Sequence, residues 1–97
     1  MSARLSMPDA SGVVRDVALP DGDCALAARG NGIELGAVDL ADAEVRIVRT
    51  RKGLRLEPVR AGALVSVSGQ DLFCKDLAHG DWFSVGGGRV SFVADAA

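Results

Sequence analysis

The sequence contains few aromatic residues and few histidines and cysteines. Among its 97 residues there are no tyrosines, one tryptophan, three phenylalanines, one histidine and two cysteines. The formal net charge of −2 lacks the basic excess that nucleic-acid binding requires, so no nucleic-acid partner is expected. No apolar run approaches the ~20 residues of a membrane helix, and the N-terminus lacks the apolar core of a signal peptide. We therefore expect a cytoplasmic protein with no membrane span in this chain.

The reactive side chains form no recognisable catalytic or metal-binding motif. Cys24 and Cys74 belong to no CxxC or Cys/His cluster, and each lies in an alternating apolar pattern that predicts a reduced core residue. His79 has no Ser, Cys or Asp partner at motif spacing, which favours an exposed turn residue over a catalytic base. The glycines at 86–88 are followed by neither Lys-Ser/Thr nor a helix, which excludes a P-loop. We expect no enzymatic activity, no cofactor and no metal.

What the sequence does contain is a series of short strand-like segments separated by turn signals. Apolar residues make up 48% of the chain, enough for the core of one domain over residues 1–97. Strands are expected at residues 3–7, 13–19, 24–27, 33–35, 44–49, 54–57, 65–68, 71–74, 82–85 and 89–93. Alternation places Val45 and Ile47 on the inner face of their strand. This spacing, without a convincing helix, predicts an all-β sandwich of about ten to eleven short, mostly antiparallel strands.

Residues 77–93 predict a turn, a strand, a second turn and a final strand that close the sandwich. The glycines at 86–88 permit the positive φ of a tight hairpin. Trp82 and Phe83 are adjacent, so they must point to opposite faces of their strand. One of the two is expected in the core, and the other exposed or covered by the N-terminal segment.

Four short segments form an ordered pattern along the chain: Asn31-Gly32-Ile33-Glu34-Leu35, Ala43-Glu44-Val45-Arg46-Ile47, Val65-Ser66-Val67-Ser68-Gly69, and Leu77-Ala78-His79-Gly80-Asp81 with Val85-Gly86. In order and spacing they resemble four motifs of the forkhead-associated (FHA) domain: its Asn-Asp-Ile-x-Leu strand, the strand after its Ser-x-x-His motif, its Thr-Phe-Val-Asn-Gly segment, and its Leu-x-x-Gly-Asp…Ile-Gly ending. The resemblance covers residues from about 3 to 93. It implies an FHA-like sandwich of eleven strands that binds phosphothreonine through loops at one end.

The phosphate-binding positions of the FHA family are not matched in this sequence. The family's arginine falls near Ala27 or Ala28, with Arg29 close by; its serine falls near Asp39, its bracing histidine near Asp42, and its loop-ordering asparagine near Ala63. Phosphate recognition needs a cation and several hydrogen-bond donors. A carboxylate repels phosphate at close range and donates no hydrogen bond. We therefore expect phosphothreonine binding to be lost.

The resemblance extends to a degenerate FHA domain in the cytoplasmic part of the inner-membrane ring proteins of type III secretion systems. It implies a scaffold domain, tethered at the inner membrane by a segment downstream of Ala97, that binds a protein partner. We expect the partner contacts at the loop residues Arg29, Asn31, Asp39, Asp42 and Arg60. Two alternatives stay open: an active phosphothreonine-peptide reader that uses Arg29 and Arg60, and a structural domain that forms homo-oligomers.

Two charged segments have more than one interpretation. Six of the eleven basic residues lie close together: Arg46, Arg49, Arg51, Lys52, Arg55 and Arg60. They predict either a patch for an acidic partner or anionic lipid, or the solvated face of a hairpin, which is favoured because charge commonly protects strand edges. The acidic residues Asp39, Asp42 and Glu44 lack the spacing of a Ca²⁺ loop. They are expected to form a surface loop that contacts a protein partner or has no function.

Overall fold

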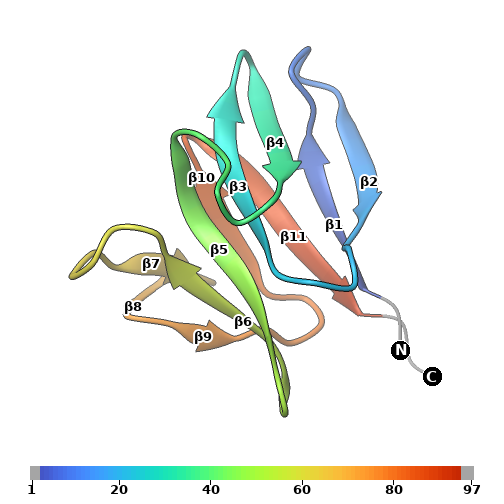
Figure 1. Ribbon diagram of the computed structural model, residues 1–97. Helices are drawn as coiled ribbons and strands as arrows, with labels where there is room; N and C mark the ends of the chain where they lie inside the picture. Colours follow the sequence, from blue (N-terminus) through green and yellow to red (C-terminus); the bar gives the residue numbers. More distant parts are fainter. Residues whose placement is uncertain (1–2, 95–97) are drawn as a thin grey trace.

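The computed structural model describes residues 3–94 (Figure 1). They form eleven β-strands, joined by loops and turns, in two antiparallel sheets. The strands are β1 (Ala3–Pro8), β2 (Val14–Ala18), β3 (Cys24–Arg29), β4 (Gly32–Gly36), β5 (Ala43–Thr50), β6 (Gly53–Pro58), β7 (Val65–Val67), β8 (Gln70–Leu72), β9 (Lys75–Asp76), β10 (Trp82–Val85) and β11 (Gly88–Ala94). One sheet has the order β2-β1-β11-β10-β7-β8, and the other has the order β4-β3-β5-β6-β9. The predicted all-β sandwich is confirmed.

The hairpin of β5 and β6 shows why these segments form strands. Val45 and Ile47 are buried, and the residues between and beside them are more exposed, which is the period-2 pattern of a strand with one face on the core. Ile47 pairs with Leu56, another buried residue, so the inner faces of the two strands coincide. On the outer face Arg46 pairs with Glu57, and their side chains form an ion pair of 3.7 Å.

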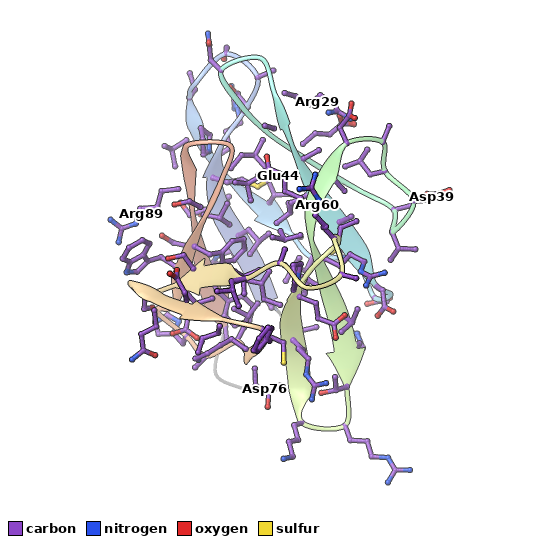
Figure 2. The ribbon with its side chains drawn as sticks, turned by 90° about the vertical axis from the view of Figure 1, so that its left-hand side faces the viewer. Arg29, Asp39, Glu44, Arg60, Asp76 and Arg89 are labelled. Carbon is purple, nitrogen blue, oxygen red and sulfur yellow. The ribbon has the colours of Figure 1, made fainter. Side chains whose placement is uncertain are left out.

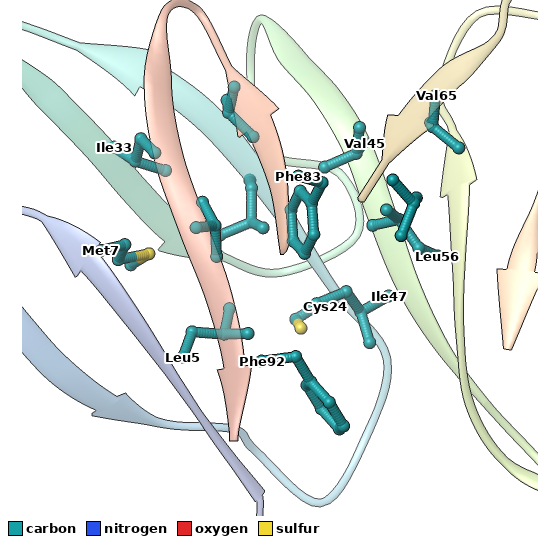
Figure 3. Packing of buried hydrophobic residues seen from close by; sticks show 14 residues of the cluster. Leu5, Met7, Cys24, Ile33, Val45, Ile47, Leu56, Val65, Phe83 and Phe92 are labelled. Carbon is teal, nitrogen blue, oxygen red and sulfur yellow. The ribbon is translucent and has the colours of Figure 1, made fainter. Parts of the chain in front are cut away.

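The core lies between the two sheets and draws side chains from eight strands (Figure 3). Its buried members are Leu5, Met7, Cys24, Leu26, Ile33, Val45, Ile47, Leu56, Val65, Val67, Phe83, Val85, Val90 and Phe92. Most are small aliphatic residues, as the scarcity of aromatics requires. Burying one such side chain stabilises the fold by on the order of 2 kcal/mol. The stability of the sandwich is therefore the sum of many modest hydrophobic contributions.

Trp82 and Phe83 point to opposite faces, as predicted. Phe83 is only 1% exposed and lies at the centre of the core. Trp82 is half-buried on the outer face, where the guanidinium of Arg89 lies 4.3 Å from the centre of its ring. Arg89 sits on the neighbouring strand β11, opposite Ser84. The tryptophan is therefore covered by a cation–π contact from the adjacent strand.

The segment after β8 corrects one prediction. Cys24 is buried, but Cys74 is exposed and is not a core residue. The physical reason is that β8 ends at Leu72 and the chain then crosses to the other sheet, where β9 pairs with β6. Phe73 and Cys74 form this crossing, and Phe73 is 73% exposed. Strand β9 (Lys75–Asp76) was not predicted, because two charged residues carry no alternating pattern.

Asp81, just before β10, holds the two sheets together at this crossing. Its carboxylate accepts hydrogen bonds from Lys75 Nζ at 2.7 Å, the Ala78 N–H at 2.9 Å and Ser68 Oγ at 3.4 Å. Lys75 belongs to β9 in one sheet, and Ser68 follows β7 in the other. Burial raises the pKa of Asp81, but these hydrogen bonds lower it more, so the pKa lies below its usual value. Asp81 is therefore a structural carboxylate.

Candidate functional site

Several connecting loops meet at one end of the sandwich. The backbone N–H of Val59, just after β6, donates to the carbonyl of Glu44 at 3.1 Å. The carboxylate of Glu44 accepts a hydrogen bond from the Gly86 N–H at 3.3 Å, in the β10–β11 turn. The guanidinium of Arg29 donates to the carbonyl of Ala41 at 2.6 Å, in the β4–β5 loop. These contacts join the β3–β4, β4–β5, β6–β7 and β10–β11 connections.

This end of the molecule carries two adjoining hollows, which we call together the loop-end groove. The larger, of about 610 Å³, is lined by Asp42, Ala43, Glu44, Pro58, Val59, Arg60, Ala63 and Leu64. The smaller, of about 240 Å³, is lined by Glu44, Val45, Leu56, Leu64, Val65, Ser66, Phe83 and Ser84. The two share Glu44 and Leu64, so the groove runs from the loops toward the space between the sheets.

Two of the five predicted partner residues, Asp42 and Arg60, line the groove. Figure 2 shows Arg60 beside Glu44, which also lines it. Neither Asp42 nor Arg60 has a side-chain hydrogen bond or ion pair within residues 3–94. Asp42 has a left-handed backbone with φ of 60°, a conformation that Asp adopts more readily than most residues. Both charges are therefore available to a ligand.

Arg29 lies near the groove, but its guanidinium already has partners within the domain. Its Nε lies 2.9 Å from Glu34 Oε1 on the neighbouring strand β4. Its Nη2 donates to the carbonyl of Ala41 at 2.6 Å, and its Nη1 donates to that of Ala28 at 3.1 Å. The side chain thus fixes the β4–β5 loop to the edge of the sheet, and Glu34 neutralises its charge.

Asn31 and Asp39 lie outside the groove. The Asn31 N–H donates to the carbonyl of Ala10 at 3.0 Å, so this residue faces the β1–β2 connection. Asp39 is exposed in the β4–β5 loop and projects outward in Figure 2. The structure therefore divides the predicted residues: Asp42 and Arg60 come together, Arg29 supports the adjoining loop, and Asn31 and Asp39 are elsewhere.

Two apolar groove residues, Val59 and Leu64, were not among the predicted partner contacts, whereas Glu44 belongs to the acidic segment that was expected to contact a protein partner or to have no function. Leu64 is 51% exposed and Val59 39% exposed, on either side of Arg60 and Ala63 in the β6–β7 loop. An apolar residue next to a predicted strand ordinarily indicates core. The alternation of the strand could have shown otherwise. Val65 and Val67 are both buried, so Leu64, an odd number of positions away from each, points to the opposite face.

The basic residues between Arg46 and Arg60 do not form one patch. Arg46 pairs with Glu57 at 3.7 Å and Arg55 with Asp76 at 3.3 Å. Arg49 donates to two backbone carbonyls in the β2–β3 connection, at 2.8 and 3.1 Å. Only the turn between β5 and β6, at residues 51–52, carries adjacent exposed cations. This arrangement supports the interpretation of a solvated hairpin.

Within the described residues, no group of three or more His, Cys, Asp or Glu side chains is placed to hold a metal ion. Residues 3–94 also include no helix with the length and apolar character needed to cross a membrane. No protein-family model matches the chain, and no curated protein matches it.

Proposed function

We propose that this domain is a non-enzymatic protein–protein interaction module, FHA-like in its fold, that binds a protein partner at the loop-end groove without recognising phosphothreonine. The observation that carries the proposal is the state of Arg29. Its guanidinium is paired with Glu34 and bonded to Ala41, so a phosphate would have to compete with both contacts.

The remaining charges of the groove support the same conclusion. Asp42 and Glu44 line it with carboxylates, and Arg60 is its one cation among the lining residues. A phosphothreonine side chain carries about −1.5 to −2 charges at neutral pH. It would meet two carboxylates and a single guanidinium, in place of a cluster of donors. The eleven-stranded, two-sheet architecture is compatible with an FHA-like domain.

The finer proposal is that the domain serves as a cytoplasmic scaffold in a membrane-associated assembly of the secretion-system type. It rests on the resemblance of four sequence segments, the last of which includes Gly80 and Asp81. In the structure Asp81 bonds Lys75 and Ala78, so the Gly-Asp pair of that motif has a structural role. Sequencing the gene beyond this chain tests the proposal: a membrane-length apolar segment supports it, and another soluble domain opposes it.

An array of phosphothreonine peptides and their unphosphorylated counterparts tests the loss of phosphate recognition. We expect no binding that depends on phosphorylation. Micromolar binding that requires the phosphate, and that is abolished by Arg29→Ala, overturns the proposal. Arg60→Ala serves as the second variant, because Arg60 is the other cation that an active phosphopeptide reader has at this end of the molecule.

A further inference from the structure

The floor of the loop-end groove is apolar and belongs to the core. Leu56 is 0% exposed and Phe83 1% exposed, yet both line the smaller hollow, together with Val45 and Val65. Because these floor side chains have almost no exposed surface, a ligand in the smaller hollow can bury apolar area only against the exposed Leu64 at its rim.

Strands β7 and β10 run side by side next to this hollow. Their register position is Phe83↔Val67, and the Ser68 N–H donates to the Trp82 carbonyl at 2.8 Å. Ser66 and Ser84 line the hollow, so this side offers hydroxyl groups that can donate to or accept from a bound segment.

The rim of the groove is also apolar on the side of the β6–β7 loop. Leu64 and Val59 are both exposed and both line the larger hollow. The pairing of β7 with β8 ends at Val65↔Leu72. Leu64 precedes β7 and the highly exposed Phe73 follows β8, both at this end of the pairing. Exposed apolar side chains gathered beside a groove are typical of a protein-binding surface.

The charge of the groove favours a cationic group in the ligand. Asp42 lies just before β5 and Glu44 at its start, and Arg60, from the β6–β7 loop, lies beside Glu44. Neither Asp42 nor Arg60 has a side-chain partner among residues 3–94, and Glu44 accepts only the Gly86 N–H. Two carboxylates and one guanidinium leave an excess of negative charge, which a lysine or arginine of the ligand complements.

We propose that the loop-end groove binds an unphosphorylated segment of a partner protein, which places an apolar side chain against Leu64 and Val59 and an adjacent lysine or arginine against Asp42 and Glu44. This inference rests on the proposed function and adds to it the chemistry of the partner segment.

The test uses the whole chain and a phage-displayed library of random dodecapeptides. Enriched peptides are synthesised, and their affinities are measured by fluorescence anisotropy. We expect them to carry a lysine or arginine next to a large apolar residue. The double variant with Asp42→Asn and Glu44→Gln should bind them about tenfold more weakly, because it removes the charges. Asparagine tolerates a left-handed backbone, and glutamine keeps an acceptor for the Gly86 N–H.

Leu64→Ser tests the apolar contact, and we expect the peptide affinity to fall about tenfold because apolar contact area is lost. The variant should still fold, since half of this side chain is already exposed. Asp21→Asn is the control: it removes the same charge at an exposed position of the β2–β3 connection, outside the groove, and should leave the affinity unchanged.

The outcomes separate this inference from the proposed function. Peptides that bind equally well to the wild type, the double variant and the Leu64→Ser variant overturn the groove as the site and leave an interaction function at another surface. Enriched peptides without a cation overturn the proposed chemistry. A library that yields no binder overturns the inference, and binding that requires phosphothreonine and Arg29 overturns both proposals.

Discussion

The guanidinium of Arg29 and the carboxylate of Glu34 lie 2.9 Å apart on the neighbouring strands β3 and β4. The same guanidinium reaches the Ala41 carbonyl in the next loop. A residue that the sequence marks as the nearest candidate for phosphate binding thus acts as a brace for the β4–β5 loop, which carries Asp42 to the edge of the groove.

Removing this brace should loosen the loop more than it lowers stability. We expect Arg29→Ala to increase hydrogen–deuterium exchange in residues 37–42, because the loop loses its bond at Ala41. The free energy of unfolding should fall by no more than about 1 kcal/mol, since the ion pair is partly exposed. Arg89→Ala is the control, because Arg89 stacks on Trp82, away from this loop. Unchanged exchange in 37–42 would show that the loop does not depend on Arg29.

Asp81→Ala should destabilise the domain by about 2 kcal/mol, because it leaves the Ala78 N–H without its acceptor and the Lys75 ammonium with only the Asp76 carbonyl. Urea unfolding followed by Trp82 fluorescence measures the change. The matched control is Asp76→Ala, which removes the carboxylate from the more exposed ion pair with Arg55 and should cost less than about 1 kcal/mol. Equal losses for the two variants contradict a special role for Asp81.

The stability of the domain should decrease in acid. Hydrogen bonds, from Ser11 and Arg15 first, hold the pKa of Asp9 well below its usual value, and the pKa of Asp81 is also lowered. A carboxyl group with a lowered pKa stabilises the fold at any pH above the unfolded-state pKa of about 3.9, and the stabilisation is lost as the pH falls toward the folded-state value. Urea midpoints should therefore be flat at about pH 6 and fall by about pH 3. In the Asp81→Ala variant the fall should be shallower.

The two cysteines should differ sharply in reactivity. Cys74 is exposed and should react at once with a thiol reagent such as Ellman's reagent. Burial raises the pKa of the Cys24 thiol to about 11, and its side chain is enclosed in the core, so it should react only as the domain unfolds. One fast thiol per chain, lost in the Cys74→Ser variant, is the expected result. Two fast thiols would mean that the core at β3 opens readily.

Adjacent glycines in the β10–β11 turn allow steric crowding to be separated from backbone strain. Gly86 and Gly87 both have positive φ, of 56° and 92°. A Cβ at Gly86 would lie 2.4 Å from Ala28 Cβ, whereas a Cβ at Gly87 would meet nothing within 4 Å. Gly87→Ala should cost about 1 kcal/mol from strain alone. Gly86→Ala should cost about 1–3 kcal/mol more, because the packing must shift. Thermal denaturation compares them, and equal effects would exclude crowding.

Much of the fold could be predicted because its strands follow a simple alternation. Val45, Ile47, Val90 and Phe92 are all buried, as their positions in the pattern require, and Phe83 is the buried member of its pair with Trp82. Strand β9 could not be predicted, since it exists only because β6 offers it an edge. The same crossing between sheets exposes Cys74, whose local pattern resembles that of a core residue.

The candidate site was predictable only in part. Asp42 and Arg60 could be placed at one end by resemblance, but their position in a shared groove depends on loops brought together by the fold. The partner of Arg29 lies five residues further along the chain, across a turn. The contact between Glu44 and Gly86 spans 42 positions. Neither interaction leaves a local signal, because charge and hydrogen-bond pairing across strands depend on register.

The pairing of β1 with β11 has a consequence for how the chain reaches this structure. The register joins Ala3 to Ala94, and these two strands lie inside their sheet, between β2 and β10. Such non-local pairing makes folding slow, on the order of milliseconds to seconds, because the chain must close a long loop before the contact can form. During synthesis β3 to β6 can associate early, whereas the other sheet must wait for β11. Until then Leu5 and Met7 remain uncovered, which is when aggregation or chaperone binding competes with folding.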